Sequence, residues 1–265
     1  MDGFEIRDVD VQNIDDLINL CVPPDKRMDP LFIKGVEEKK RWALVMLKKF
    51  GSFAKIAYME NKPVGMIQFV PKIDEKVVEI TCIFVPDKNY QRRGVGKKLL
   101  KELIDEMREP KEWFKNEPPL ALVTHAFAVP GFYPQHEFFT RMGFKRVRED
   151  NPFLLYYPMR ENYVYKPRED YIPQREDVGK VLIFYDASCP FCIYFNEKIK
   201  NLIREVDPDI PIRIVNMLIE EEEVKKRGKV PFCIVNTHPI KTSFFEKEKF
   251  QKEVKEAIKK PPLQT

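Results

Sequence analysis

The sequence has no apolar run long enough to cross a bilayer, since its longest apolar stretches have the length of single strands. Its first residues lack the basic segment followed by an apolar segment that marks a secretory signal. The opposite charges nearly cancel, with 46 Lys and Arg against 42 Asp and Glu. We therefore expect a cytoplasmic protein without membrane contact and without a dedicated nucleic-acid surface.

Cysteine is scarce, and the five residues of this type are odd in number. An odd count without a secretion signal argues against a framework of structural disulfides. Cys189 and Cys192 form the one tight pair, and that spacing predicts redox or metal chemistry. We interpret Cys21 and Cys82 as small buried hydrophobic residues.

Alternating strand-like and helix-like patterns run through residues 1–160 and start again at 181. They predict an α/β fold for both parts. Residues 161–180 are rich in Pro, Arg, Glu and Asp and poor in aliphatic residues, which is typical of a linker. We therefore predict a first domain over 1–160, a linker over 161–180 and a second domain over 181–265.

A glycine-containing loop, Gln91–Gly96, lies between a predicted strand ending at Val85 and a predicted helix over Gly94–Arg108. A helix N-terminus offers unpaired backbone N–H groups and a favourable dipole, and glycines let phosphate oxygens approach the main chain. Arg92 and Arg93 add positive charge. The pattern predicts an anion site at a helix start, and a plain surface turn with two arginines is the alternative.

The Gln91–Gly96 loop and the later segment Phe138–Phe144 resemble, in order, two motifs of the GNAT acetyltransferase family, over about residues 1–160. The resemblance implies a mixed sheet with helices on both faces. It implies acetyl-CoA as the acyl donor and the amine of a small molecule or peptide as the acceptor. The residues that it assigns to CoA are Ile83, Phe84, Val85, Gln91, Arg92, Arg93, Gly94, Val95, Gly96 and Phe139.

Transfer of an acetyl group to an amine requires a base, because the amine arrives mostly protonated. Glu79 lies on the strand before the loop, close to where some members of the family carry a glutamate base. In a regularly alternating strand it would share a face with Thr81 and Ile83. The alternative is a solvent-facing charge on a half-exposed strand.

The family often has a tyrosine at the position of Phe139, where it donates a proton to the departing thiolate. Phenylalanine cannot donate, so another group supplies the proton or none is needed. Tyr133, His125 and His136 are the nearby candidates for that acid.

The second cluster is Cys189-Pro190-Phe191-Cys192, between a predicted strand over Val181–Tyr185 and a predicted helix over Phe191–Val206. A cysteine at a helix N-terminus is a nucleophile near neutral pH, and a second one a turn later can resolve a mixed disulfide. We therefore predict that Cys189 is the reactive thiol and Cys192 the shielded one.

The second domain resembles a thioredoxin-like domain, closer to glutaredoxins, and Val230-Pro231-Phe232 looks like its cis-proline loop. Ile183 stands where thioredoxin has a buried acid, and Asn236–Pro239 replaces a Gly-Gly pair that binds glutathione. The whole chain resembles the YoaP-like acetyltransferases. That resemblance implies a thiol or disulfide partner, and a second domain that regulates the enzyme or recruits its substrate.

Two other functions stay open on the residues alone. One is a thiol-disulfide oxidoreductase whose GNAT part only binds acyl-CoA or a partner. The other is an adaptor stabilised by zinc, and its Cys₃His ligand set would be Cys189, Cys192, Cys233 and His238. We prefer the redox dithiol and expect no bound metal.

Overall fold

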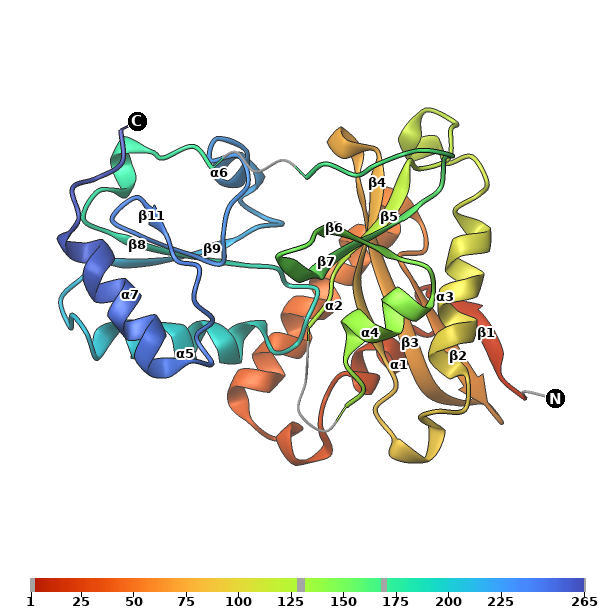
Figure 1. Cartoon of the computed structure of the whole chain (residues 1–265). Coiled ribbons are helices and arrows are strands. Elements are labelled where there is room, and N and C mark those ends of the chain that lie inside the picture. The colour runs from red at the N-terminus through yellow and green to blue at the C-terminus, as the bar shows by residue number, and fades with distance from the viewer. Residues whose placement is uncertain (1–2, 128–131, 168–170, 265) are drawn as a thin grey trace. The chain divides into compact units, whose positions relative to one another are not determined.

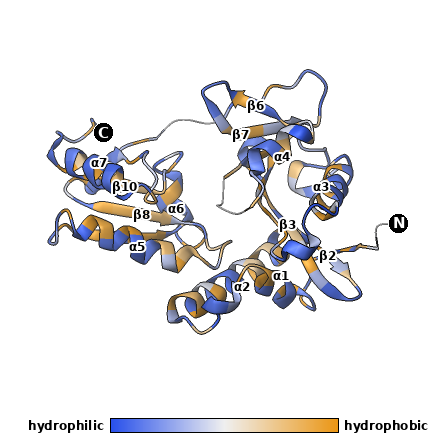
Figure 2. Ribbon diagram, turned by 60° about the horizontal axis from the view of Figure 1, so that its bottom comes forward, coloured by the Kyte–Doolittle hydropathy of each residue, from blue (hydrophilic) through white to orange (hydrophobic). Residues whose placement is uncertain are grey.

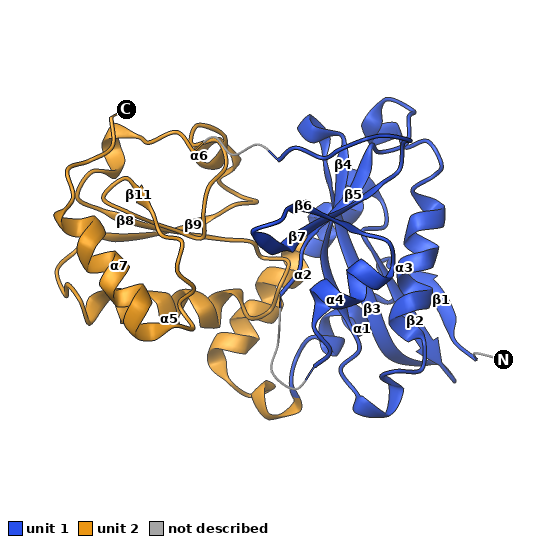
Figure 3. Ribbon diagram, in the orientation of Figure 1, with its two compact units in different colours: residues 1–23, 43–167 blue, residues 24–42, 168–265 orange. Residues whose placement is uncertain are grey.

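The computed structural model describes residues 3–127, 132–167 and 171–264. The chain divides into two compact units (Figure 3). Unit 1 comprises Met1–Pro23 and Ala43–Pro167, and unit 2 comprises Pro24–Trp42 and Arg168–Thr265. This division differs from the boundaries predicted from the sequence, because residues 24–42 group with the second unit.

Unit 1 is built on a seven-stranded sheet of order β1-β2-β3-β4-β5-β7-β6 (Figure 1). β4 and β5 pair in parallel, and the other neighbours pair antiparallel. The mixed α/β sheet predicted for this part of the chain is confirmed. Its strands are β1 (Glu5–Asp8), β2 (Ala54–Met59), β3 (Lys62–Lys72), β4 (Val77–Phe84), β5 (Ala121–His125), β6 (Lys145–Arg148) and β7 (Asn151–Pro158).

Four α-helices accompany this sheet in the described residues: α1 (Ile14–Leu20), α2 (Pro30–Phe50), α3 (Val95–Glu106) and α4 (Gln135–Arg141). α3 is amphipathic, and Leu99, Leu100 and Leu103 on its apolar stripe are fully buried against the sheet. α2 is one continuous helix whose first half belongs to unit 2. None of the described helices combines the length and the apolar composition that crossing a membrane requires.

Unit 2 is built on a four-stranded sheet of order β11-β10-β8-β9, in which β8 and β9 are parallel. Val181–Phe184 of β8 are all buried, because residues pack on both faces of the strand. The ribbon of β8 is accordingly coloured as hydrophobic in Figure 2. The strands are β8 (Val181–Tyr185), β9 (Ile212–Asn216), β10 (Cys233–Val235) and β11 (His238–Pro239). The helices are α5 (Cys192–Arg204), α6 (Glu221–Lys225) and α7 (Lys247–Lys259).

The predicted linker packs closely at both of its described ends, while residues 168–170 lie outside the described residues. In unit 1, the buried Tyr165 donates from its hydroxyl to Glu75 at 2.6 Å. In unit 2, Asp177 accepts two hydrogen bonds from the fully buried guanidinium of Arg227, at 2.6 and 2.8 Å. Tyr165 and Asp177, both within the predicted linker, therefore anchor the chain to a core.

Candidate functional site

The site in unit 1 begins where β4 leaves β5. The two strands pair from Val77↔Ala121 to Ile80↔Thr124. The Thr124 hydroxyl closes the last pair by donating to the Ile80 carbonyl at 2.9 Å. Beyond that point the described ladder of β4 continues with β3 alone. One edge of the second half of β4 is therefore left without a neighbouring strand.

β4 also carries a bulge. Thr81 has no ladder partner, because Phe69 and Gln68 of β3 pair with the residues on either side of it. An extra residue of this kind reverses the alternation of side chains beyond it. Glu79 therefore lies on the opposite face of the sheet from Ile83, and the expectation that these residues share a face is wrong.

The loop before α3 places glycine at the point where the chain turns into the helix. Gly94 is the N-cap and has a φ of 87°, a conformation that L-residues rarely adopt. It has no side chain that could cap the helix, so the N–H groups of the first turn stay available. Arg92 and Arg93 are exposed, and within the described chain their side chains make no hydrogen bond or ion pair. α3 begins at Val95, one residue later than predicted.

Two glutamines position the main chain around this loop. Gln91 donates from Nε2 to the carbonyl oxygen of Val85 at 2.9 Å, which ties the loop to the end of β4. Gln135, at the start of α4, donates to the Ile83 carbonyl at 3.2 Å and accepts from the N–H of Phe127 at 3.4 Å. Gln135 therefore spans the opening between the ends of β4 and β5. The sequence analysis missed it, because a single glutamine at a helix start carries no signal.

Two adjacent aromatic residues of α4, Phe138 and Phe139, lie in different surroundings. Phe139 is fully buried in the core and packs against Phe138 and Phe144, with ring centroids at 5.3 and 4.9 Å. Phe138 instead lies beside the start of α3. Its ring is so close to Gly96 that a Cβ added there would be 3.6 Å from it. The aromatic side chain next to the glycine loop is therefore that of Phe138, which was not among the residues predicted from the sequence.

A cavity of about 700 Å³ lies beside the start of α3. It combines two basic side chains, Lys97 and Arg141, with aromatic rings. Its lining is Lys97, Tyr133, Phe138, Arg141, Met142, Gly143 and Tyr157. The combination suits an anionic ligand that also carries a flat ring.

Glu79 is partly buried and paired. Its Oε2 lies 2.8 Å from Nζ of Lys72, and 26% of its side chain is exposed. A carboxylate that is accessible and held by a lysine can accept a proton from a substrate that reaches this face.

The candidate acids lie in different surroundings. Tyr133 is exposed in the α4 cavity, and desolvation together with a hydrogen bond to Glu137 raises the pKa of its phenol. Arg141 lies over its ring, 5.3 Å from the centroid. His136 packs edge-on against the ring of Phe153, and His125 is exposed at the end of β5.

In unit 2, the two CxxC thiols differ sharply in exposure. Cys189 is exposed in the turn after β8, while Cys192 is buried and begins α5. The N–H of Cys192 donates to the Cys189 carbonyl at 3.1 Å. Burial, and next the neighbouring Cys189, raises the pKa of Cys192 from 9.0 to about 12. α5 begins at Cys192, so Cys189 lies three residues ahead of the helix and not at its N-terminus, as the sequence predicted.

Two details of unit 2 differ from what the sequence analysis considered. No peptide bond among the described residues is cis, so the Val230–Pro231 bond is trans, the isomer favoured intrinsically, and the expected cis-proline is wrong. The Cys₃His set is not assembled, because the described residues contain no cluster of three or more potential metal ligands. Cys233 is fully buried on β10, and His238 contacts the Pro261 carbonyl at 2.9 Å.

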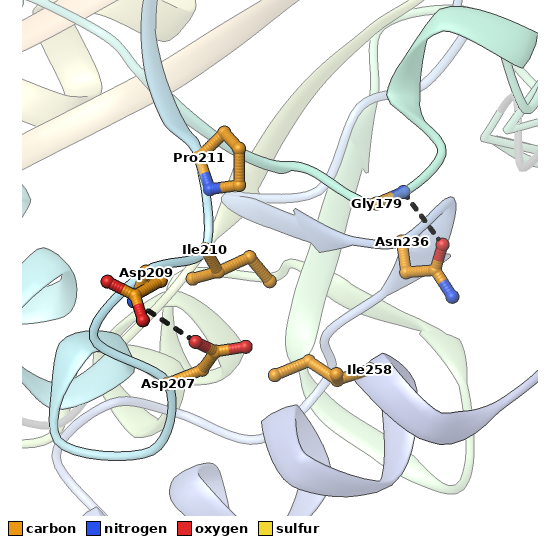
Figure 4. A pocket seen from close by; sticks show the side chains of 7 residues that line it. All are labelled: Gly179, Asp207, Asp209, Ile210, Pro211, Asn236 and Ile258. Atoms are coloured by element: carbon orange, nitrogen blue, oxygen red, sulfur yellow. Dashed lines mark hydrogen bonds between the residues drawn. The ribbon is translucent and has the colours of Figure 1, made fainter.

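A second cavity, of about 300 Å³, lies in unit 2 and contains no cysteine (Figure 4). Its polar groups are used locally: Asp207 accepts from the N–H of Asp209 at 3.1 Å, and Asn236 accepts from the N–H of Gly179 at 2.9 Å. We assign no function to it.

Several solved structures are similar to part of this chain. One is the paia N-acetyltransferase of Thermoplasma acidophilum in complex with coenzyme A (17% identity, 58% of this chain and 98% of that chain, TM-score 0.42). Another is a GNAT family acetyltransferase of Brucella melitensis in complex with acetyl-CoA (16%, 60% and 89%, TM-score 0.39). A third is N-acetylglutamate synthase of Neisseria gonorrhoeae complexed with coenzyme A and L-arginine, of which this chain covers only 34% (17% identity, 60% of this chain, TM-score 0.38).

A comparison with curated protein sequences finds no match. The family assignment rests on a family model, described as the Acetyltransferase (GNAT) family, which matches residues 14–144. That range contains β4, the glycine loop, α3 and α4, which together form the site described above. Residues 14–144 are therefore a GNAT acetyltransferase domain, and the chain is an acetyl-CoA-dependent N-acyltransferase.

Proposed function

We propose that unit 1 holds acetyl-CoA at the Gln91–Gly96 loop and transfers its acetyl group to the amine of a small molecule or peptide. The observation that carries this proposal is the start of α3. Gly94 leaves the N–H groups of the first turn without a cap, and two arginines beside it have exposed, unpaired side chains within the described residues. A pyrophosphate needs such converging donors.

The rest of the donor has a matching place on either side of the loop. The open edge of β4 offers backbone groups to the amides of the pantetheine arm, as strands do to one another. The side chain of Gln135 now bonds to the Ile83 carbonyl, and a pantetheine amide can replace that bond. Lys97 and Arg141, with the rings of the α4 cavity, suit the phosphorylated adenosine end.

Glu79 takes the amine proton in this proposal, directly or through a water molecule. Its carboxylate lies 2.8 Å from the Lys72 ammonium, and 26% of its side chain is exposed, so an amine on this face of the sheet can reach it. Thr81, the extra residue of the bulge, frees main-chain groups of β4 near the reacting carbonyl. A thiolate leaves without a strong acid, so the burial of Phe139 is compatible with transfer, and Tyr133 remains the candidate donor.

Radiolabelled acetyl-CoA and a pool of primary amines test the proposal. We expect label to appear in N-acetylated products at a rate proportional to the enzyme concentration. A Gly94→Glu variant, tested beside it, should lose most of this transfer. Hydrolysis of acetyl-CoA without acetylation of any amine would contradict the proposal.

A second candidate function belongs to unit 2. The exposure of Cys189, the burial of Cys192 and the βαβ–ββα order of the strands and helices support a thioredoxin-like dithiol. We propose that this dithiol exchanges with disulfides and thereby regulates the transferase or recruits its substrate. Titration with a thiol–disulfide buffer should give a two-electron transition that is lost in Cys189→Ser, and its absence from the wild type would contradict this function.

A further inference from the structure

The first half of α2 covers the turn that carries the CxxC motif. Residues 24–42 belong to unit 2, together with the cysteines (Figure 3). Phe32 and Gly35 are three residues apart, so both lie on one face of the helix. That face contacts Pro190 and Phe191, the two residues between the cysteines.

Gly35 brings the backbone of α2 directly onto Pro190. A Cβ on Gly35 would stand 1.9 Å from the Pro190 carbonyl oxygen and 2.8 Å from its carbonyl carbon. Glycine inside a helix costs ~1 kcal/mol relative to alanine, so this position sacrifices helix stability for a close approach. Any larger residue would lift the helix from the turn.

Phe32 covers the second inter-cysteine residue. Only 1% of Phe32 is exposed, and its ring meets that of Phe191 edge-on with centroids 4.7 Å apart. Tyr194 flanks it at 5.5 Å. One helical turn after Gly35, Glu38 accepts a weak hydrogen bond from Asn216 at the end of β9, at 3.5 Å. From Phe32 to Glu38, α2 therefore contacts first the CxxC turn and then the end of β9.

This cover affects small and large disulfides differently. Cys189 itself stays exposed, so a small disulfide can reach its sulfur. A disulfide in a protein is flanked by two main chains, whose Cα atoms are ~5.5–6 Å apart. At least one of those chains must lie beside the attacking sulfur. α2 already covers Pro190 and Phe191, the surface beside Cys189 on which such a chain would lie.

We propose that the dithiol of Cys189 and Cys192 reacts with low-molecular-weight disulfides and excludes disulfides of folded proteins, because the first half of α2 is seated on the CxxC turn. This inference rests on the dithiol function proposed above. It adds the class of substrate, and it makes α2 the element that selects it.

The reaction balances with a small disulfide R–S–S–R as the oxidant. The Cys189 thiolate attacks one sulfur, forms a mixed disulfide and expels one RS⁻. Cys192 then gives up its proton to that thiolate, attacks the Cys189 sulfur and expels the second RS⁻, which takes a proton from water. The protein dithiol loses two electrons, and the small disulfide becomes two thiols.

Single-turnover oxidation of the reduced full-length chain tests the proposal. The probes are 2-hydroxyethyl disulfide and insulin, and each rate is divided by the rate of dithiothreitol with the same disulfide. The wild type should favour 2-hydroxyethyl disulfide over insulin by at least tenfold on this relative scale. Cys189→Ser should react with neither.

Two variants should lift α2 from the turn: Gly35→Leu by a clash, and Phe32→Ala by loss of packing. Each should raise the insulin rate at least tenfold while the rate with 2-hydroxyethyl disulfide stays within twofold. Ile33→Ala is the matched control, because Ile33 is exposed on the same helix. Phe32→Ala keeps the test decisive if Gly35→Leu does not fold, as judged by circular dichroism.

Equal relative rates of the wild type with the two probes would overturn the selection by α2 and leave the dithiol function standing. Insulin rates unchanged in a folded Phe32→Ala variant would also overturn it. No reaction of the wild type with either probe would instead overturn the dithiol function itself.

Discussion

The side-chain amide of Gln91 donates to the main-chain oxygen of Val85 at 2.9 Å and so ties the glycine loop to the end of β4. Gln91→Ala removes this bond without touching the N–H groups of α3. We expect acetyl-CoA affinity to fall about two- to tenfold, the worth of one net hydrogen bond. Fluorescence or calorimetric titration measures it.

Gln251→Ala is the control for this prediction, because Gln251 makes the same type of bond, to the Leu202 carbonyl at 3.1 Å in unit 2. It should leave acetyl-CoA affinity unchanged. If both variants bind acetyl-CoA as the wild type does, the loop is held by other contacts.

Glu79→Gln should slow acetyl transfer by about 10²–10⁴-fold if Glu79 is the base. The loss should shrink as the pH rises, because more of the amine then arrives without its extra proton. Both effects are measured by the initial rates of the variant and the wild type between about pH 6 and 10, within the pH range in which both proteins stay folded.

The matched control is Glu102→Gln, an exposed glutamate on α3, which should keep the rate of the wild type. A Glu79→Gln enzyme with the pH–rate profile of the wild type would show that the proton leaves by another route.

Cys192 should resist alkylation at pH 8 while Cys189 is labelled. Burial, followed by the nearby Cys189, raises the pKa of Cys192 to about 12. A raised pKa keeps the thiol protonated below that value, so only ~10⁻⁴ of it is thiolate at pH 8. Its labelling rate should therefore rise about tenfold per pH unit above 8.

Limiting iodoacetamide followed by peptide mapping checks this pattern, with urea-denatured protein as the control in which both cysteines react. Equal labelling of the two cysteines in the native protein would rule out the shielded position of Cys192.

Arg227→Ala should destabilise unit 2 strongly. The guanidinium is fully buried and forms a bidentate pair with Asp177, so its removal leaves a buried carboxylate uncompensated. Loss of one partner of such a pair costs about 3–5 kcal/mol of unfolding free energy. Urea denaturation followed by circular dichroism measures it.

Arg213→Ala is the comparison, since Arg213 pairs with Glu220 and Glu223 while 48% of its side chain is exposed. Its loss should cost less than about 1 kcal/mol. Similar losses in the two variants would mean that the buried pair stabilises unit 2 no more than the exposed pair does.

Local signals in the sequence predicted much of the site. The glycine loop gave the start of α3 to within one residue, because Gly94 adopts a φ that glycine favours. The CxxC motif likewise predicted an exposed first cysteine and a buried second one. The start of α3 and the exposure of the two cysteines could be predicted because each depends on the local backbone conformation and on the spacing of nearby residues.

Features that depend on a partner far along the chain were not predictable. The bulge at Thr81 arises from the register with β3, so alternation within β4 alone gave the wrong face for Ile83. The first half of α2 joins unit 2 through Gly35 and Phe32, whose contacts lie more than 150 residues away. A glycine or a phenylalanine in a helix does not by itself predict a contact with a distant segment of the chain.

The central claim is that acetyl-CoA binds with its pyrophosphate at the start of α3. Calorimetric titration of acetyl-CoA into the wild type, Gly94→Glu and Gly51→Glu tests it most directly. Gly51 is the matched control, because both glycines have positive φ and open space where a Cβ would lie, so the backbone strain is alike. Gly94→Glu should weaken binding at least tenfold, or ~1.4 kcal/mol, while Gly51→Glu binds like the wild type. Equal affinity of Gly94→Glu and the wild type would contradict the claim.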